Sequence, residues 1–292
     1  MRGASFLFPA DPSLSCRSAG RAERTFPPLL PASASDRRHL ARVATADGPA
    51  WALLRDDHFD LLDGPPWSGG RALGVSLPRA GATLLAPVVP GKIVCIGVNY
   101  ADHARESVTR TTLPDEPVLF MKPPSSVVGP GAAIALPPGV GRVDHEAELG
   151  IVIGRRTFRA DRAAAIAAIA GVVAVNDVSA RVLQKKDGQF TRAKGFDTFC
   201  PIGPVVALDL DPADLYVRAR VNGEMRQDGR SRDLACGPVD LVVYISNVMT
   251  LEPGDVISTG TPAGVGPIAP GDTVEIEVEG VGVLANPVIE RR

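Results

Sequence analysis

Two glutamates lie two positions apart in the segment D-H-E-A-E-L-G-I-V-I-G, residues 144–154. If this segment is a strand, Glu146 and Glu148 point to the same face, because side chains alternate with a period of two. The opposite face then carries apolar side chains of the kind found in a core. Two carboxylates side by side repel each other, and a divalent cation between them removes that conflict. Spacing alone leaves a second interpretation open, in which the strand lies at a solvated edge and both glutamates are on the surface.

A third acidic residue favours the metal interpretation. Asp177 ends a strand predicted over residues 172–177, which follows an Ala-rich crossover helix. Strands joined by one crossover often lie side by side in a sheet, so we expect Asp177 to meet Glu146 and Glu148. Three carboxylates without an adjacent His or Cys suit a hard cation, Mg²⁺ or Mn²⁺, rather than Zn²⁺.

Polar and cationic residues follow Asp177 along the chain. Arg181 and Gln184 lie four and seven positions after it, so a helix there places all three on one face. Arg181 offers a planar fork suited to a carboxylate or an enolate oxygen. Lys194 lies in a predicted loop, T-R-A-K-G-F-D, and is a candidate second cation. Taken singly, residues of these types are more often solvated surface groups.

A histidine and a glutamate lie three positions apart in G-V-N-Y-A-D-H-A-R-E, residues 97–106. A short helix there makes His103 and Glu106 neighbours. A carboxylate bonded to one imidazole nitrogen fixes the tautomer and raises the basicity of the other nitrogen, as a water-activating base requires. The alternative is a pair with a structural role only.

Short strands and tight turns dominate the pattern around these residues. The chain has 30 Gly and 27 Pro among 292 residues, which favours turns over long helices. Helices are predicted over residues 163–170, with Asp161 as N-cap and Gly171 as C-terminal stop, and over residues 238–249. Residues 215–221 alternate as a strand. Together these elements predict a β-rich α+β fold with mixed sheets.

The chain is predicted to divide into three parts. Residues 1–35 are rich in Ser and Pro and are expected to form a flexible N-terminal extension. Residues 36–88 predict a small N-terminal β domain and linker, with a β-hairpin over residues 39–55 and a Gly- and Pro-rich linker over residues 62–90. Residues 89–292 carry the polar motifs and are expected to form the catalytic domain.

Charge and hydropathy exclude several classes of protein. The chain has 31 Lys and Arg against 33 Asp and Glu, a formal net charge of −2, which argues against a nucleic-acid partner and a polybasic membrane surface. The longest apolar stretch, residues 163–175, is too short to span a membrane. The N-terminus does not fit a signal peptide. We therefore expect a cytoplasmic protein with no membrane or nucleic-acid partner.

Seven motifs follow one another between residues 90 and 292. They are G-V-N-Y-A-D-H-A-R-E, E-P-V-L-F-M-K-P, D-H-E-A-E-L-G-I-V-I-G, V-N-D-V-S-A-R-V-L-Q, K-G-F-D-T-F-C-P-I-G-P, V-N-G-E-M-R-Q-D-G and L-E-P-G-D-V-I-S-T-G-T-P-A-G-V-G. In this order they resemble motifs of the fumarylacetoacetate hydrolase family, and of its acylpyruvase and 2-hydroxyhepta-2,4-diene-1,7-dioate isomerase branch in particular. The resemblance implies a roll of mixed β-sheets, a homodimer and one Mg²⁺ or Mn²⁺ per chain.

The resemblance also implies a role for each residue that matches a functional position of the family. The implied metal ligands are Glu146, Glu148 and Asp177. The implied catalytic residues are His103, Glu106 and Lys194. The implied substrate contacts are Arg181, Gln184 and Thr261.

The implied activity is hydrolysis of a carbon–carbon bond in a 2,4-dioxo acid, an acylpyruvate or a fumarylpyruvate-like compound, in aromatic catabolism. His103 would activate a water, while the metal, Lys194 and Arg181 would stabilise the enolate that leaves. The same enolate chemistry leaves open decarboxylation of an oxaloacetate-like β-keto acid and isomerisation of a 2-hydroxy-diene-dioate. A non-catalytic ligand-binding relative is a more remote alternative.

Overall fold

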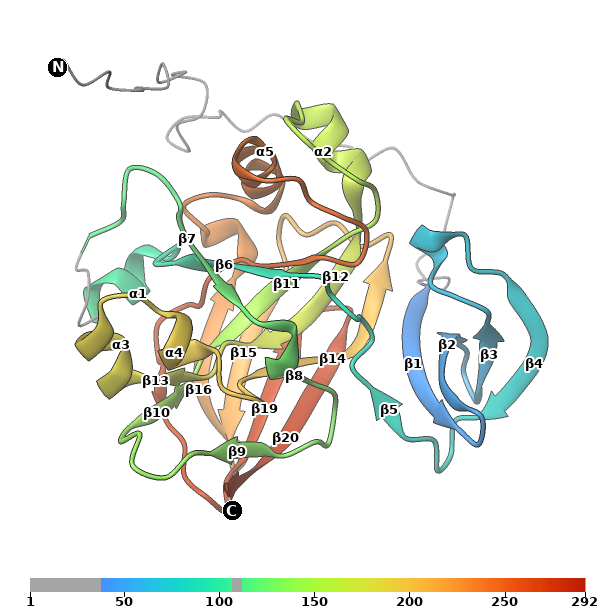
Figure 1. Cartoon of the computed structure of the whole chain (residues 1–292), viewed down its shortest axis with the longest axis horizontal. Helices are drawn as coiled ribbons and strands as arrows, with labels where there is room; N and C mark the ends of the chain where they lie inside the picture. Colours follow the sequence, from blue (N-terminus) through green and yellow to red (C-terminus); the bar gives the residue numbers. More distant parts are fainter. Residues whose placement is uncertain (1–37, 107–111, 292) are drawn as a thin grey trace, which may run out of the picture.

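The computed structural model describes residues 38–106 and 112–291. The predicted flexible extension, residues 1–35, lies outside the described residues, as does part of the segment that follows Glu106. Figure 1 shows a large body of strands, with a smaller group of strands, β1 to β4, at one side.

Strands are the commonest regular element of the described chain. The N-terminal strands are β1 (His39–Thr45), β2 (Gly48–Leu54), β3 (His58–Leu62), β4 (Ala72–Pro78) and β5 (Leu84–Leu85). The strands up to the middle of the chain are β6 (Ile93–Gly97), β7 (Val118–Lys122), β8 (Val127–Val128), β9 (Ile134–Leu136), β10 (Val143–His145), β11 (Ala147–Ile153), β12 (Ile169–Asn176) and β13 (Ser179–Ala180). The remaining strands are β14 (Cys200–Leu208), β15 (Tyr216–Val221), β16 (Glu224–Arg230), β17 (Val256–Ser258), β18 (Gly266–Pro267), β19 (Thr273–Val278) and β20 (Gly282–Glu290).

The helices are short. They are α1 (Ala101–Glu106), α2 (Arg162–Ala168), α3 (Arg181–Asp187), α4 (Thr191–Lys194) and α5 (Pro238–Val248), with single 3₁₀ turns at Pro66–Ser68, Pro124–Ser126 and Ser231–Asp233. α1, α3 and α4 gather on one side of the body, away from the N-terminal strands, while α2 packs against α5 (Figure 1). None of the described helices is long and apolar enough to cross a membrane.

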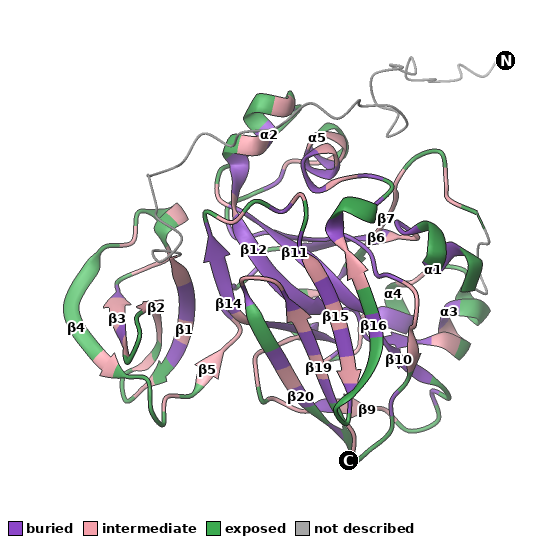
Figure 2. Ribbon diagram, turned by 180° about the vertical axis from the view of Figure 1, so that it is seen from behind, coloured by how far each residue is buried: buried purple, intermediate pink, exposed green. Residues whose placement is uncertain are grey.

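Two large sheets form the body, and both contain parallel and antiparallel pairs. The first sheet has the strand order β4-β3-β2-β1-β14-β12-β11-β17-β6-β7, and the second has the order β16-β15-β19-β20-β9. Strands β11, β12 and β14 of the first sheet pack against β15, β19 and β20 of the second, so their facing side chains form the core. Figure 2 shows this buried centre in purple. The predicted β-rich α+β fold with mixed sheets is confirmed.

The N-terminal strands form the expected small β domain. β1 and β2 pair as the predicted hairpin, from His39↔Leu54 to Thr45↔Gly48. β1 also pairs with β14, which joins the small domain to the main sheet. The prediction of a linker over residues 62–90 was wrong for Ala72–Pro78, because this segment pairs with β3 as the edge strand β4.

The connection from β11 to β12 runs through α2, and the antiparallel pairing of the two strands brings the predicted acidic residues together. Asp161 caps α2 as expected, since its side chain accepts a hydrogen bond from the Ala164 amide at 2.8 Å. The helix ends at Ala168, before the predicted stop at Gly171, which lies inside β12. A Cβ on Gly171 would come within 2.4 Å of the Ala207 carbonyl oxygen, so glycine is required there for close strand packing, not for a helix end.

Candidate active site

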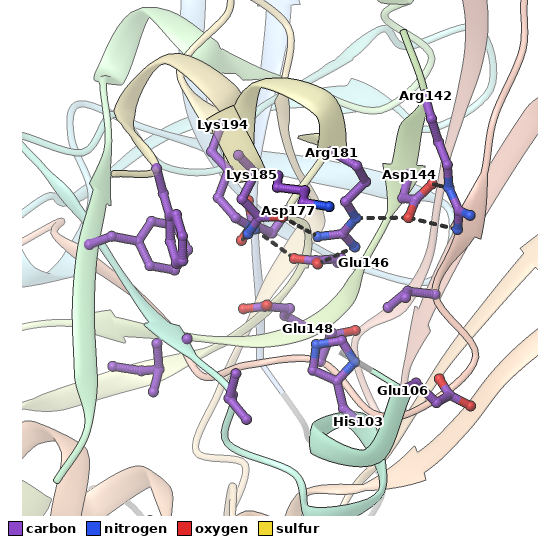
Figure 3. A pocket seen from close by; sticks show the side chains of 18 of the residues that line it. His103, Glu106, Arg142, Asp144, Glu146, Glu148, Asp177, Arg181, Lys185 and Lys194 are labelled. Carbon is purple, nitrogen blue, oxygen red and sulfur yellow. Dashed lines mark hydrogen bonds and ion pairs between the residues drawn. The ribbon is translucent and has the colours of Figure 1, made fainter. Parts of the chain in front are cut away.

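A cavity of about 520 Å³ lies at the side of the main sheet that α1, α3 and α4 cover (Figure 3). Its walls come from segments far apart in the sequence: the ends of β6 and β7, the three short helices and the loop between β17 and β18. Every residue predicted for the site lines this cavity: His103, Glu106, Glu146, Glu148, Asp177, Arg181, Gln184, Lys194 and Thr261.

The predicted carboxylates converge. β11 and β12 are antiparallel neighbours with Ala147 opposite Asn176, and the Asp177 amide donates to the Glu146 carbonyl at 2.9 Å. This register places Asp177 beside both glutamates. One oxygen from each of Glu146, Glu148 and Asp177 lies within 4.8 Å of the others, and all three residues are buried. The metal interpretation of the spacing therefore agrees with the structure better than the solvated edge strand.

Two of these carboxylates are held by buried cations. Lys194, at the end of α4, donates to Glu146 at 2.7 Å, to Asp177 at 2.5 Å and to the Ser179 hydroxyl at 2.7 Å. Lys122, at the end of β7, donates to the other Asp177 oxygen at 2.6 Å. Burial opposes charge on Glu146, but Lys194 and Arg181 hold the pKa of that carboxyl well below its usual range. Both oxygens of Asp177 thus have a lysine partner.

Glu148 differs from the other two carboxylates in its partners. Its Oε2 accepts hydrogen bonds from the Ser258 hydroxyl at 2.5 Å and the Gly260 amide at 2.9 Å, but no Lys or Arg of the described residues forms an ion pair with it. Burial, with repulsion from Asp177 and Glu146 added, raises the pKa of Glu148 to about 8. Glu148 is therefore the carboxylate of this cluster that lacks a counter-charge.

The guanidinium group of Arg181 is hydrogen-bonded to neighbouring side chains, two of them acidic. Its Nε donates to Asp144 at 2.8 Å, its Nη1 to Gln184 at 2.9 Å and its Nη2 to Glu146 at 2.6 Å. β13 pairs with β10, Asp144 opposite Ser179, and this pairing brings the first residue of α3 beside Asp144. The prediction that Asp177 shares a helix face with Arg181 was wrong, because α3 begins only at Arg181.

The predicted short helix exists, but the predicted His–Glu hydrogen bond is not formed. His103 and Glu106 both lie on α1, yet the His103 Nδ1 is buried without a partner among the described residues. Glu106 Oε2 instead accepts a hydrogen bond from the Gly264 amide at 2.8 Å. Figure 3 shows the Glu106 carboxylate turned away from the imidazole. Burial is the main cause that lowers the pKa of His103, which favours the neutral ring.

Thr261 is anchored at the cavity wall. Its hydroxyl donates to the Ala147 carbonyl at 2.8 Å and accepts from Gln227 Nε2 at 2.8 Å. Gln227 also donates to the Pro262 carbonyl at 2.8 Å and accepts from the Ala147 amide at 2.9 Å. Gln227 therefore ties the loop after β17 to the start of β11, next to the carboxylates.

Lys122, Arg142 and Asp144 belong to this arrangement and were missed from the sequence. Lys122 is fully buried and forms an ion pair with Asp177. Its position at the end of a strand, inside one of the family motifs, did not indicate that it belongs to the site. Asp144 is 1% exposed in its side chain and joins Arg181 to Arg142, whose Nε and Nη2 donate to it at 2.7 and 3.0 Å. The signal that could have found Asp144 is its position two residues before Glu146 in the acidic run.

The donor set fits a hard divalent cation. It consists of carboxylate oxygens only, which Mg²⁺ and Mn²⁺ prefer, and each oxygen has lone pairs beyond those used by the lysines. Four carboxylates, those of Asp144, Glu146, Glu148 and Asp177, are buried here. The buried Lys122 and Lys194, the partly exposed Arg181 and the exposed Arg142 form ion pairs with Asp144, Glu146 and Asp177, but no cation of the described residues forms one with Glu148. A cation beside Glu148 would supply the missing counter-charge.

The fold and the carboxylate cluster define a strand-rich protein with a buried site suited to a divalent cation. Comparison with known proteins agrees with this class. The family model described as fumarylacetoacetate (FAA) hydrolase C-terminal matches residues 92–289. A second family model, described as Rv2993c-like, N-terminal, matches residues 38–87. The chain belongs to the fumarylacetoacetate hydrolase family.

Curated relatives cover both parts of the chain. The chain is 45% identical over 262 residues to Protein Rv2993c of Mycobacterium tuberculosis, a match that covers 86% of this chain and 98% of the relative. It is 41% identical over 234 residues to a mitochondrial oxaloacetate tautomerase of Rattus norvegicus, over 75% of this chain and 74% of the relative.

Solved structures share the fold. A 2-hydroxyhepta-2,4-diene-1,7-dioate isomerase from Mycobacterium marinum is 44% identical, with a TM-score of 0.80 over 87% of this chain and 99% of that chain. A maleylpyruvate hydrolase from Sphingobium sp. SYK-6, in complex with manganese(II) and pyruvate, is 30% identical, with a TM-score of 0.71 over 87% of this chain and 100% of that chain. The similar proteins thus include isomerases, a hydrolase and a tautomerase.

Proposed function

We propose that the protein is a divalent-metal-dependent enzyme that hydrolyses a carbon–carbon bond in a 2,4-dioxo acid. The observation that carries the proposal is the convergence of Glu146, Glu148 and Asp177 in one cavity that also contains His103 and Lys194. The similar maleylpyruvate hydrolase, which holds manganese(II) and pyruvate, supports both the metal and a 2-oxo acid fragment as ligands.

Glu146, Glu148 and Asp177 would hold one Mg²⁺ or Mn²⁺. When bound, the dication supplies Lewis-acid polarisation of the 2-oxo and carboxylate oxygens of the substrate. Lys194 and Arg181 lower the pKa of Glu146 and so keep this carboxyl ionised, while Lys122 and Lys194 form ion pairs with Asp177. The chain therefore supplies cationic partners to two of the buried ligands.

His103 is the proposed base. Its neutral imidazole accepts a proton from a water, and the water oxygen attacks the distal carbonyl carbon of the substrate. The carbon–carbon bond then breaks, and its electron pair moves into the 2-oxo acid fragment as an enolate. Lys194, whose charge is stabilised by Asp177 and Glu146 against the cost of burial, lines the cavity and would stabilise the enolate oxygen through its positive charge. His103 returns the proton that it took from the water to the enolate carbon, which completes the reaction and restores the neutral imidazole.

Cationic side chains at the cavity wall favour a substrate that carries a second negative charge at the end away from its 2-oxo acid group. Arg142 has 55% of its side chain exposed, and its pair with the buried Asp144 holds the guanidinium in place. Lys185 is exposed on α3 and also lines the cavity, and it forms no ion pair with the other described residues. Such cations complement a second carboxylate, so the preferred 2,4-dioxo acid is a dicarboxylate such as a fumarylpyruvate-like compound rather than a simple acylpyruvate.

A second candidate is proton transfer without water attack, as in tautomerisation of an oxaloacetate-like 2-oxo dicarboxylate or isomerisation of a diene-dioate. The specific observation that favours it is that Glu106 is bonded to Gly264 and not to His103. A histidine without a carboxylate partner is sufficient to move a proton at the carbon next to a carbonyl. The oxaloacetate tautomerase and the dienedioate isomerase among the similar proteins use substrates of this kind by name.

The experiment that tests the proposal uses metal-stripped full-length protein, Mg²⁺ or Mn²⁺, and a panel of acetylpyruvate, fumarylpyruvate, oxaloacetate and a 2-hydroxy-diene-dioate. Metal-dependent cleavage of fumarylpyruvate, with products confirmed by chromatography, is the expected result. Proton exchange or enol conversion without cleavage would instead support the second candidate. Full activity of stringently metal-free protein, or no turnover of any compound, would refute a metal-dependent enzyme of this class.

A matched pair of variants tests the ligand assignment. Glu148→Gln keeps the size of the side chain and is expected to weaken Mn²⁺ binding strongly, because a neutral amide replaces an anionic ligand. Glu290→Gln, at the exposed end of β20, makes the same chemical change away from the cavity and is the control. An unchanged Mn²⁺ titration of Glu148→Gln by calorimetry would exclude Glu148 as a ligand.

We also propose that the protein is a cytoplasmic homodimer that acts in aromatic catabolism. The family resemblance supports the dimer, and an ordinary globular composition with no span among the described helices is consistent with the location. Light scattering of the purified protein tests the dimer, and a monomer at micromolar concentration would contradict it.

A further inference from the structure

Strand β17 ends in a serine on a sheet face that is mostly apolar. Ser258 lies opposite Gly150 of β11 on one side and opposite Cys95 of β6 on the other. Val256 and Cys95 belong to one buried apolar cluster, and Ile257 belongs to the other. Because side chains alternate along a strand, Ser258 shares its face with Val256 and Cys95. Ser258 has no exposed surface, so its hydroxyl needs a partner inside the protein.

The partner of this hydroxyl is Glu148, on the neighbouring strand β11. Glu148 is two positions from Gly150, the residue opposite Ser258, so both side chains lie on the same face. On the other side of β11, Glu148 faces Val175 and Gly150 faces Val173, and both valines are fully buried. These apolar neighbours offer the carboxylate no hydrogen bond, whereas the Ser258 hydroxyl donates to Glu148 Oε2 at 2.5 Å.

The two oxygens of the Glu148 carboxylate have different surroundings. Oε2 accepts from the Ser258 hydroxyl and, at 2.9 Å, from the Gly260 amide. Oε1 accepts no hydrogen bond from the residues that the structure describes. With both donors on Oε2, the carboxylate is turned so that the lone pairs of Oε1 are left for another partner.

We propose that Ser258 is a positioning residue of the metal site, whose hydroxyl fixes Glu148 Oε2 against β17 and leaves Oε1 for the divalent cation. Ion pairs with lysines orient Glu146 and Asp177, but Glu148 has no such pair. Ser258 does not line the cavity, so it acts through Glu148 and not on the substrate. The proposal deepens the proposed function and rests on it, because it takes Glu148 to be a metal ligand.

Three substitutions at position 258 separate the hydroxyl from the packing of the side chain. Ser258→Ala removes the donor without adding volume. Ser258→Thr and Ser258→Val have the same shape, but only the Thr variant keeps a hydroxyl. Because partners that orient metal ligands are worth about 10–100-fold in affinity, Mn²⁺ binding should weaken about tenfold or more in the Ala variant. For the same reason the Val variant should bind Mn²⁺ at least about fivefold more weakly than the Thr variant.

Ser246→Ala is the matched control. Ser246 on α5 is also fully buried, and its hydroxyl accepts from the Ala160 amide and donates to the Val243 carbonyl, both at 2.9 Å. It does not line the cavity. Loss of this hydroxyl should lower Tm and leave the Mn²⁺ affinity unchanged, which is the result expected of a serine with a structural role only.

Calorimetric titration of metal-stripped full-length protein with Mn²⁺ measures the affinity, and thermal unfolding checks that each variant is folded. At saturating Mn²⁺, kcat of Ser258→Ala should return to within about threefold of wild type, because the hydroxyl acts on the affinity for the ion.

Two results would overturn the role of Ser258. One is a Mn²⁺ affinity of Ser258→Ala within about twofold of wild type, and the other is equal affinity in the Thr and Val variants. If the added methyl group prevents the Thr and Val variants from folding, the comparison of Ser258→Ala with wild type decides. Wild type that binds no Mn²⁺ would refute the proposed function as well. Wild type that binds Mn²⁺ but cleaves no compound of the panel would refute the proposed reaction alone, and the titrations would still decide the role of Ser258.

Discussion

Glu148 allows a quantitative prediction about stability and pH in the absence of metal. Its pKa is raised from the ordinary value of 4.5 to about 8, first by burial and then by Asp177 and Glu146. Below pH 4.5, the pKa of Glu148 in the unfolded state, the side chain is protonated in both the folded and the unfolded state. In that range Glu148 does not lower the free energy of unfolding. As the pH rises toward 8, the unfolded state loses this proton while the folded state keeps it, so the free energy of unfolding falls.

The magnitude follows from the interval between the two values. At 1.36 kcal/mol for each pH unit, raising the pKa from 4.5 to about 8 costs about 5 kcal/mol at high pH, of which about 4 kcal/mol develops between pH 5 and pH 9. The Glu148→Gln variant has no such proton. The difference in unfolding free energy between this variant and wild type should therefore shift by about 4 kcal/mol in favour of the variant over that range, or on the order of 10 °C in Tm.

The assay is thermal and urea unfolding of EDTA-treated wild type, Glu148→Gln and the control Glu290→Gln at pH 5, 6, 7, 8 and 9. Other groups titrate in all three proteins, so the differences between them isolate Glu148. Saturating Mg²⁺ or Mn²⁺ should restore the stability of wild type at pH 8 and 9 and should do so much less in Glu148→Gln, because the ion binds the carboxylate form. Parallel stability curves for wild type and Glu148→Gln across this range would refute the reasoning.

Three further substitutions have defined outcomes. Lys122→Met should destabilise the protein by about 3–5 kcal/mol in urea unfolding, because it leaves Asp177 with less compensation for its buried charge; a loss below about 1 kcal/mol would contradict that pairing. Lys185→Ala should raise KM for a 2-oxo dicarboxylate about tenfold and leave a monocarboxylate unaffected, while the neighbouring Lys186→Ala changes neither; equal effects on both substrates would exclude Lys185 from recognition of the distal group. His103→Ala should lower kcat for cleavage about 10²–10⁴-fold with Mn²⁺ affinity unchanged in calorimetry, and a kcat close to that of wild type would remove His103 as the base.

Local patterns predicted the elements that depend on local physics. The hairpin of β1 and β2, the N-cap of α2 by Asp161 and the position of α5 follow from turn residues, capping and hydrophobic periodicity, which act within a few residues. Errors occurred where a distant neighbour decided the outcome. Gly171 lies in β12 because Ala207 packs against it, and Ala72–Pro78 forms β4 because β3 offers an edge to pair with.

The hydrogen-bond partners inside the site were the least predictable feature. Spacing on a helix made His103 and Glu106 neighbours, but it could not reveal that the Gly264 amide competes for the same carboxylate. Similarly, nothing around Lys122 in the sequence indicates that its ammonium group is buried against Asp177. Such contacts join residues 55 and 158 positions apart, and their geometry depends on how β7, β12 and the loop after β17 pack.

The sequence by itself determined the chemistry that the site can offer. The period of two along a strand suggested that Glu146 and Glu148 share a face, and the expectation that consecutive strands are neighbours suggested Asp177 as their third partner. The antiparallel pairing of β11 with β12, which puts the end of β12 beside the start of β11, was decided by the tertiary structure. Only the tertiary structure decided how those charges are balanced. Lys122, Lys194 and Arg181 neutralise Glu146 and Asp177, while Glu148 is left to hydrogen bonds alone, since the cost of burying a charge depends on which neighbours the fold brings within a few ångströms of it.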